Sequence, residues 1–364
     1  MATLKRQETD SRENPLLKTT YARHLLIVLL PSCSSFLSLF LPSFLSMTAL
    51  FFAATSIASN TYAQDFAPPP QKNSARIVSI GGGITEIIYA LGQQHRLVGT
   101  DTSSIFPAAT EQLPKVGYMR ALSAEGVISL KPDLVIASAH TGPPAVMQQL
   151  QQSGIPVVLV DETPTLENIA HKIEQIAALL NVPERGNLLT ADFRSQVDRV
   201  NRSITGATFR DSTLSENPRG SDSTSILPKV LFILGHAGGT PMVAGAETAA
   251  DSIITLAGGL NAFNGFTGYK PMTTEAIIRA NPDVILVTTQ GLTRIGGIDS
   301  LVKFPGVGLT RAGQMRQILD YDALLLLGFG PRTPTVMLEL HQALLSIGEE
   351  PEAIHAPVGL GNRL

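Results

Sequence analysis

The chain has 364 residues, of which 44% are hydrophobic and 16% are charged, and its formal net charge is −3. This length allows one large domain or two lobes with sizeable cores, and the charge argues against the basic surface of a nucleic-acid-binding protein. The only cysteine, Cys33, falls in the leader described next, so we expect neither a disulfide nor thiolate chemistry in the mature chain.

A secretory signal peptide is predicted at residues 1–63. Basic residues precede a long apolar, serine-rich run, and small residues ending at Ala63 follow it, which is typical of an exported protein. The run is longer than usual, so an uncleaved membrane anchor is an alternative. Lipidation of Cys33 is disfavoured because Pro31 would lie inside the lipobox. Residues 64–75 form a proline-rich linker, and we expect the mature protein in the periplasm.

An N-terminal α/β lobe is predicted at residues 76–180, because strands alternate with helices there and this order favours a parallel sheet. A glycine-rich turn follows the first strand. Gly81 and Gly83 match the first two glycines of a dinucleotide-binding GxGxxG motif, but Glu86 occupies the third position. We therefore expect the glycines to let backbone approach a ligand or a neighbouring helix, not to hold a nucleotide.

A long helix is predicted to join this lobe to a second one. It covers residues 181–206, and a helix of roughly 20 residues spans about 30 Å. The polar segment 207–228 has no hydrophobic periodicity and is predicted to be a flexible loop. The C-terminal α/β lobe takes up residues 229–364. Its expected elements are a strand at 229–234, a glycine-rich turn carrying His236, a helix at 249–257, a strand at 284–288, a loop at 290–294, a last strand and turn at 323–332 and a final helix at 335–345.

One segment of the chain occurs twice. Around Glu125 and again around Glu275 the sequence follows the pattern Glu-x-(Val/Ile)-Ile-x-x-x-Pro-Asp, with three apolar residues after it and a Gly-Tyr pair before it. Each copy predicts a short helix with Ser123 or Thr273 as N-cap, a turn and a buried strand. Two such units indicate two α/β lobes, with their tyrosines on loops where ligands gather in open sheets.

The motifs favour binding over catalysis. The sequence has no GxSxG or HExxH motif and no histidine pair at metal-binding spacing. A periplasmic α/β enzyme remains an alternative hypothesis, which would need a base and a nucleophile in the cleft. Phenolate is a hard, anionic donor suited to ferric iron, and tyrosine is an axial haem ligand. Arg120, two residues after Tyr118, is placed to support a phenolate or to pair with a haem propionate.

From about Arg76 to Leu345 the chain resembles the periplasmic haem-binding proteins of bacterial haem ABC importers, which belong to the cobalamin and siderophore class of substrate-binding proteins. The resemblance implies two Rossmann-like lobes with parallel sheets, joined by a long rigid helix, with haem held between them. Segments 81–88, 116–126, 235–245, 268–271 and 327–332 carry it.

The resemblance also implies roles for individual residues. Tyr118 is the expected axial ligand of Fe(III), with Arg120 beside it, and His236 is expected to be another ligand or a contact to a second haem. Tyr269 and Lys270 are expected to line the opposite wall of the haem site.

The family often has an arginine on the loop after the strand at 284–288. Gln290 occupies that position here, and Arg294 nearby is the substitute candidate.

The expected partner is an inner-membrane ABC permease, whose arginines would contact Glu125 and Glu275. We expect a monomer that carries haem and performs no reaction. The nearest alternative on the same fold is a carrier of ferric siderophore or cobalamin, which needs no axial phenolate.

Overall fold

The computed structural model describes residues 75–213, 227–235 and 242–347, with side chains up to residue 205 in the first range. The predicted signal peptide, the linker before Ala75 and His236 lie outside the described residues. In the ranges that the structure does describe, no helix is both long enough and apolar enough to cross a membrane.

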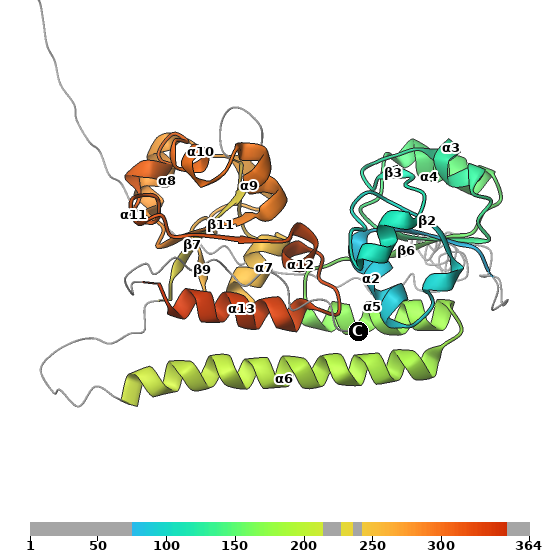
Figure 1. The fold of residues 1–364 in the computed structure, drawn as a ribbon, viewed down its shortest axis with the longest axis horizontal. Coiled ribbons are helices and arrows are strands. Elements are labelled where there is room, and N and C mark those ends of the chain that lie inside the picture. Colours follow the sequence, from blue (N-terminus) through green and yellow to red (C-terminus); the bar gives the residue numbers. More distant parts are fainter. Residues whose placement is uncertain (1–74, 214–226, 236–241, 348–364) are drawn as a thin grey trace, which may run out of the picture. The chain divides into compact units, whose positions relative to one another are not determined.

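The first lobe contains a four-stranded parallel sheet in the order β2-β1-β5-β6 (Figure 1). Alternate strand residues enter two hydrophobic clusters, one shared with helices α2 and α5 and the other with α3 and α4. Because helices cover both faces, the strands are apolar almost throughout. The elements are β1 Ile77–Ile80, α2 Gly82–Ala90, β2 Leu97–Thr100, α3 Ala124–Ser129, β5 Leu134–Ser138, α4 Pro144–Gln152, β6 Val157–Val160 and α5 Leu166–Leu179.

The second lobe contains a mixed six-stranded sheet in the order β10-β8-β7-β11-β12, with β9 also paired to β7. Strands β9, β7, β11 and β12 run parallel, whereas β8 and β10 are antiparallel to their neighbours. The strands are β7 Lys229–Leu234, β8 Met242–Ala244, β9 Leu260–Asn261, β10 Tyr269–Pro271, β11 Val284–Thr288 and β12 Ile318–Tyr321.

The prediction of an all-parallel second sheet is therefore wrong at one edge. Only seven residues separate β7 from β8, and a parallel pairing would need a crossover of a dozen or more residues.

The helices of the second lobe correct two further predictions. The segment expected to be the last strand begins with helix α12, Ala323–Leu327, in which Asp322 caps the N-terminus by accepting a bond from the Leu325 N–H at 2.9 Å. A short leucine run does not distinguish helix from strand by periodicity. The predicted loop at 290–294 is helix α9, Thr289–Ile295, capped by Thr288. The other helices are α7 Ala249–Leu256, α8 Thr274–Ala280, α10 Ile298–Val302, α11 Arg311–Met315 and α13 Thr333–Leu345.

The connecting helix α6 covers Pro183–Thr213 and has 31 residues, a length of about 46 Å. It continues seven residues past the predicted end at 206, and this extension, 207–213, contains no proline or glycine to end the helix. α6 packs along α5 and α13 (Figure 1). Side chains of these three helices belong to one hydrophobic cluster that also contains β1 of the first sheet and β11 of the second. The two lobes thus share a core.

Candidate functional site

Tyr118 lies on a two-stranded hairpin of the first lobe. Strand β3, Gly117–Tyr118, pairs with β4, Ala121–Leu122, with Tyr118 opposite Ala121. Met119 in the turn packs against the first-lobe core. Tyr118 is 46% exposed, and Arg120 is exposed as well. The hairpin therefore presents a phenol and a guanidinium to the solvent from one short turn.

Two neighbouring loops hold this hairpin in place. The Gly142 N–H donates to the Met119 carbonyl at 2.9 Å, and the Gly142 carbonyl accepts from the Leu122 N–H at 3.1 Å. On the other side, the Thr102 N–H donates to the Gly117 carbonyl at 2.9 Å. Gly117 has φ of +104°, a conformation that favours glycine. These backbone bonds fix Tyr118 on a supported turn.

Tyr269 has a different environment. Its hydroxyl is hydrogen-bonded to Thr248 and to the backbone of Ala250 at the start of α7, and its ring meets Phe232 edge-on at 6.2 Å. Burial raises the pKa of Tyr269, while those hydrogen bonds and the positive charge of Arg120 act in the opposite direction. Tyr269 is thus a neutral phenol held by its own lobe, which suits a wall of the site better than an iron ligand.

The charge of Arg120 has a small effect on the pKa of Tyr269 in the other lobe. Arg120 belongs to the first lobe and Tyr269 to the second, and the charge of the first is close enough to lower the pKa of the second. Next to Tyr269, the Lys270 ammonium lies 4.9 Å from the centre of the Phe266 ring and is exposed. Among the predicted site residues that the structure describes, the electrostatic influence of Arg120 on Tyr269 links the two lobes.

Gln290 and Arg294 are not brought into this group. The Gln290 amide donates to the Asp322 carboxylate at 2.7 Å and accepts from the Ala323 N–H at 2.9 Å, so its polar atoms hold the start of α12. Arg294 is exposed in the last turn of α9. In the described part of the chain, no hydrogen bond or ion pair connects it to another predicted site residue.

The two glutamates predicted to contact a permease occupy equivalent positions. Glu125 and Glu275 are exposed residues in the first turns of α3 and α8. The predicted N-caps are confirmed: Ser123 accepts from the Gly126 N–H at 3.2 Å, and Thr273 accepts from the Ala276 N–H at 3.3 Å. Neither carboxylate forms an ion pair with a residue that the structure describes.

Metal-binding groups are sparse among the described residues. No cluster of three or more histidine, cysteine, aspartate or glutamate side chains suitable for a metal ion occurs in these ranges. His236, the other predicted ligand, lies outside the described residues.

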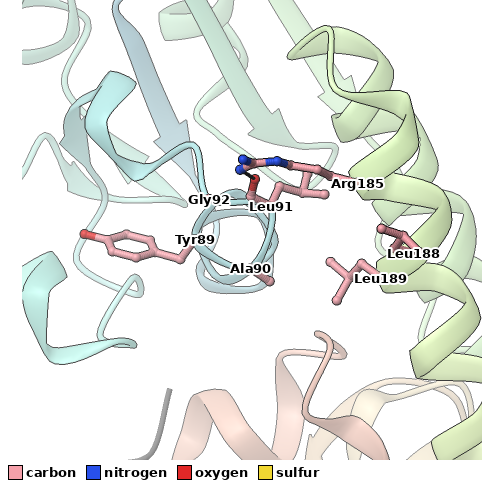
Figure 2. Close-up of a pocket in the computed structure, with 7 residues that line it drawn as sticks. All are labelled: Tyr89, Ala90, Leu91, Gly92, Arg185, Leu188 and Leu189. Atoms are coloured by element: carbon pink, nitrogen blue, oxygen red, sulfur yellow. Dashed lines mark hydrogen bonds between the residues drawn. The ribbon is translucent and has the colours of Figure 1, made fainter.

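A surface pocket of about 430 Å³ lies away from the predicted site (Figure 2). It is formed where the end of α2 meets the start of α6, and the Arg185 guanidinium closes one side by donating to the Leu91 carbonyl at 2.9 Å. None of the predicted site residues lines it, so we do not assign the ligand to it. The lining residues are Tyr89, Ala90, Leu91, Gly92, Arg185, Leu188 and Leu189.

Some structurally important residues were not predicted from the sequence. Lys172 is completely buried on α5 and donates to the Phe329 carbonyl at 2.9 Å. Lys172 lies three residues after Ile169 and therefore near the apolar face of the helix. This spacing could have indicated from the sequence that Lys172 is buried. The ion pair between Glu86 and Arg332 joins positions 246 residues apart, and no local pattern could indicate it.

Two α/β lobes with a shared core and a long connecting helix define a two-lobed binding protein. The chain belongs to the periplasmic binding protein family, whose model matches residues 77–324. This family consists of substrate-binding proteins that are not enzymes. The predicted resemblance and the predicted two-lobed α/β fold are thereby confirmed.

Similar proteins include carriers of two kinds of ligand. The solved structure of the periplasmic haem-binding protein BhuT in complex with two haems shares 42% identity, covers 74% of this chain and 97% of that chain, and has a TM-score of 0.67. The chain is 28% identical to YvrC of Bacillus subtilis (strain 168), an uncharacterized ABC transporter substrate-binding lipoprotein, over 75% of this chain and 81% of the relative. It is 29% identical to the vitamin B12-binding protein of Vibrio campbellii (strain ATCC BAA-1116), over 69% of this chain and 82% of the relative.

Proposed function

We propose that this protein binds haem as cargo in the periplasm and delivers it to an inner-membrane ABC transporter. The observation that carries the proposal is the hairpin of Tyr118 and Arg120, which presents an exposed phenol next to an exposed guanidinium. The similarity to BhuT, at 42% identity, supports haem over cobalamin, for which the relative is 29% identical.

The chemistry of these residues fits haem. Ferric iron is a hard cation that tyrosinate binds well, and Tyr118 has the exposure that such a ligand needs. The haem propionates are anionic, and Arg120 and Lys270 are exposed cations that can pair with carboxylates. Tyr269 supplies a neutral aromatic surface for the porphyrin. His236 is a second ligand or a contact to another haem in this proposal, and Arg294 is a peripheral cation.

Delivery requires export and a docking partner. In this proposal residues 1–63 direct export, and Glu125 and Glu275 each contact a basic residue of the permease. Their exposure and their equivalent places in the two lobes support this role. Similarity to an ABC transporter substrate-binding lipoprotein supports the class of partner.

Cobalamin is the second candidate cargo, favoured by the similarity to the Vibrio campbellii protein. Separate absorbance titrations of the purified mature chain with haemin and with cyanocobalamin distinguish the two. We expect saturable binding of haemin, with an end point of one or two equivalents, and no saturable binding of cyanocobalamin. Saturation by cyanocobalamin alone would overturn the proposal in favour of the vitamin.

A further inference from the structure

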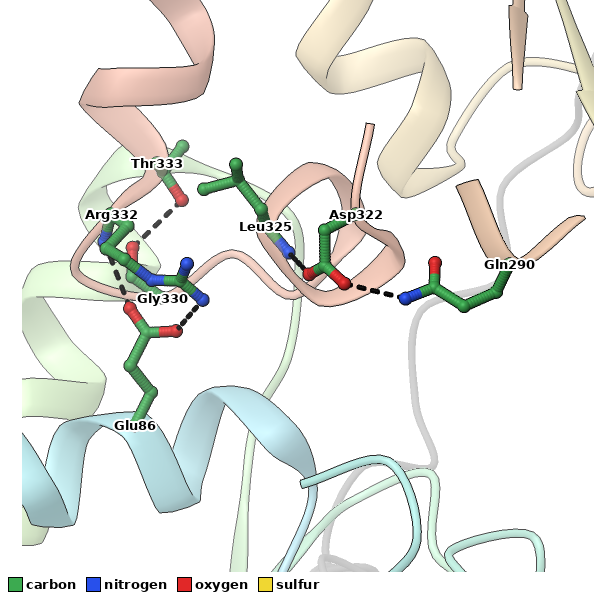
Figure 3. Close-up of polar contacts among 7 residues, drawn as sticks. All are labelled: Glu86, Gln290, Asp322, Leu325, Gly330, Arg332 and Thr333. Carbon is green, nitrogen blue, oxygen red and sulfur yellow. Dashed lines mark hydrogen bonds and ion pairs between the residues drawn. The ribbon is translucent and has the colours of Figure 1, made fainter. Parts of the chain in front are cut away.

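The two lobes are joined by a contact that is independent of α6. Glu86 on α2 of the first lobe is only 5% exposed. Its carboxylate accepts bonds from the Arg332 backbone N–H at 3.2 Å and from the Arg332 guanidinium at 2.9 Å, at the start of α13 (Figure 3). The same guanidinium lies 3.5 Å from the centre of the Phe106 ring. The first lobe therefore contacts Arg332 in three ways: Glu86 pairs with its guanidinium, Glu86 accepts from its backbone N–H, and Phe106 stacks against its guanidinium.

A buried lysine adds a second attachment. Lys172 on α5 is 0% exposed, and its ammonium donates to the Phe329 carbonyl at 2.9 Å. Burial lowers the pKa of Lys172, and the negative charges of Glu162, Asp161 and Glu86 oppose that effect. Glu162 has the largest of these effects and Glu86 the smallest. Lys172 and the Glu86–Arg332 pair are therefore two separate attachments of the same segment.

Glycines bring the two backbones into direct contact at this place. A Cβ atom on Gly83 would lie 2.6 Å from the Gly328 carbonyl oxygen, and one on Gly330 would lie 3.2 Å from the Glu86 carboxyl. On Gly82 it would lie 2.5 Å from the Leu324 side chain. A Cβ atom on Gly82 or Gly83 would overlap neighbouring atoms, and one on Gly330 would fit only tightly, so the two elements are closely packed here.

The other end of the same segment is attached to the second lobe. The Asp322 carboxylate caps α12 through the Leu325 N–H at 2.9 Å and accepts from the Gln290 amide at 2.7 Å (Figure 3). Gln290 follows β11 and lies in α9. Residues 322–332, which we call the crossover segment, are therefore bound to α9 at one end and to α2 and α5 at the other.

We propose that Glu86 and Lys172 are positioning residues: by fixing the crossover segment on the first lobe they set the spacing of Tyr118 and Tyr269 across the ligand site. A buried ion pair contributes little net stability after desolvation, whereas its geometry can select one arrangement. The effect on haem rests on the proposed function, but the effect on lobe spacing does not.

Spin-label distances between the lobes test this inference without any ligand. The mature chain lacks cysteine, so labels can be placed at Gln148→Cys on α4 and Lys303→Cys after α10, both exposed. We expect a narrow distance distribution for the parent protein and a broadened or shifted one for Glu86→Gln and Lys172→Met. The matched control is Glu167→Gln, whose carboxylate forms an exposed ion pair with Arg194 at 3.4 Å, and it should retain the parent distribution.

Gln290→Ala removes the bonds that hold the crossover segment to α9 at Asp322 and Ala323. Because Gln290 is only half-buried, this variant can be measured even if the buried substitutions prevent folding. It should broaden the distribution in the same way. Haemin titration of the folded variants should show affinity reduced by about tenfold, with the control unchanged. Parent-like distances in folded Glu86→Gln and Gln290→Ala would overturn the inference. Failure of the parent to bind haemin would instead count against the proposed function and leave the distance result valid.

Discussion

The carboxylate of Asp133 accepts a hydrogen bond from the backbone N–H of Arg76 at 2.7 Å, and the Asp133 N–H donates to the Arg76 carbonyl at 2.8 Å. The second lobe repeats this relationship: Asp283 accepts from the Lys229 N–H at 2.9 Å and donates to the Lys229 carbonyl at 2.8 Å. The Pro-Asp motif of the repeat thus fixes the start of the first strand in each lobe.

The basic side chains complete the same arrangement in both copies. The Arg76 guanidinium donates to the Leu130 carbonyl at 2.8 Å, and the Lys229 ammonium donates to the Ala280 carbonyl at 3.0 Å. Both carbonyls lie at the C-terminal end of the preceding short helix, where cations are favourable. The sequence repeat is therefore a repeat of hydrogen bonds.

Removing either aspartate should destabilise its lobe. We expect Asp133→Ala and Asp283→Ala each to lower the free energy of unfolding by about 1–3 kcal/mol, because the backbone N–H of Arg76 or Lys229 loses its charged acceptor. Denaturant unfolding measures the change, with Asp198→Ala on the exposed face of α6 as control. If both variants unfolded like this control, the structural role of the motif would be refuted.

The glycines after β1 should tolerate no side chain. Gly83→Ala would place a Cβ 2.6 Å from the Gly328 carbonyl oxygen. We expect this overpacking to lower the free energy of unfolding by about 1–3 kcal/mol, which exceeds the stabilisation from the higher helix propensity of alanine. Gly265→Ala, where no atom lies within 4 Å of the added Cβ, should be nearly neutral. Thermal unfolding compares the two, and equal stability would contradict the close contact.

The ionisation of Tyr269 reports whether the hairpin faces the second lobe. Burial raises its pKa and the charge of Arg120 partly opposes this, so Arg120→Gln should raise the pKa of Tyr269 further. Alkaline titration of phenolate absorbance, with Tyr269→Phe to assign the group, measures the shift. No change in Arg120→Gln would place Arg120 away from Tyr269.

The sign of the associated stability effect follows from linkage. Because the folded-state pKa of Tyr269 lies above its unfolded value, its contribution to stability is complete below the unfolded pKa of about 10 and is lost as the pH rises through the folded value. Tyr269→Phe should therefore reduce the loss of thermal stability above that pH.

Local patterns in the sequence predicted much of the fold but not the contacts between lobes. The repeat identified both N-caps, Ser123 and Thr273, and the strands that follow, because capping and buried strands are local signals. The leucine run of α12 was misassigned because its periodicity suits either element. The antiparallel pairing of β8 with β7 follows from the short connection between them. The residues of one strand do not show which neighbour it pairs with or in which direction.

For the site residues too, local motifs could be read from the sequence, whereas contacts between distant residues could not. Tyr118 and Arg120 were proposed because they stand together in one motif, and their role in binding stays a prediction. The equivalent positions of Glu125 and Glu275 followed from the repeat. Gln290 was noted only because it occupies the position where the family often has an arginine. Its bond to Asp322 was not predicted, since a side chain's partner depends on packing that the sequence does not display. The glycines before Glu86 were expected to permit close approach, and the close partner is Gly328.

The most direct test of haem binding through Tyr118 is the absorbance spectrum of the haemin complex of the mature chain beside that of Tyr118→Phe, which removes only the phenolic oxygen. We predict that the parent shows a ferric spectrum with phenolate charge-transfer absorbance, and that Tyr118→Phe loses this absorbance and binds haemin at least about tenfold more weakly. An unchanged spectrum and affinity in Tyr118→Phe would contradict the assignment of Tyr118 as the iron ligand.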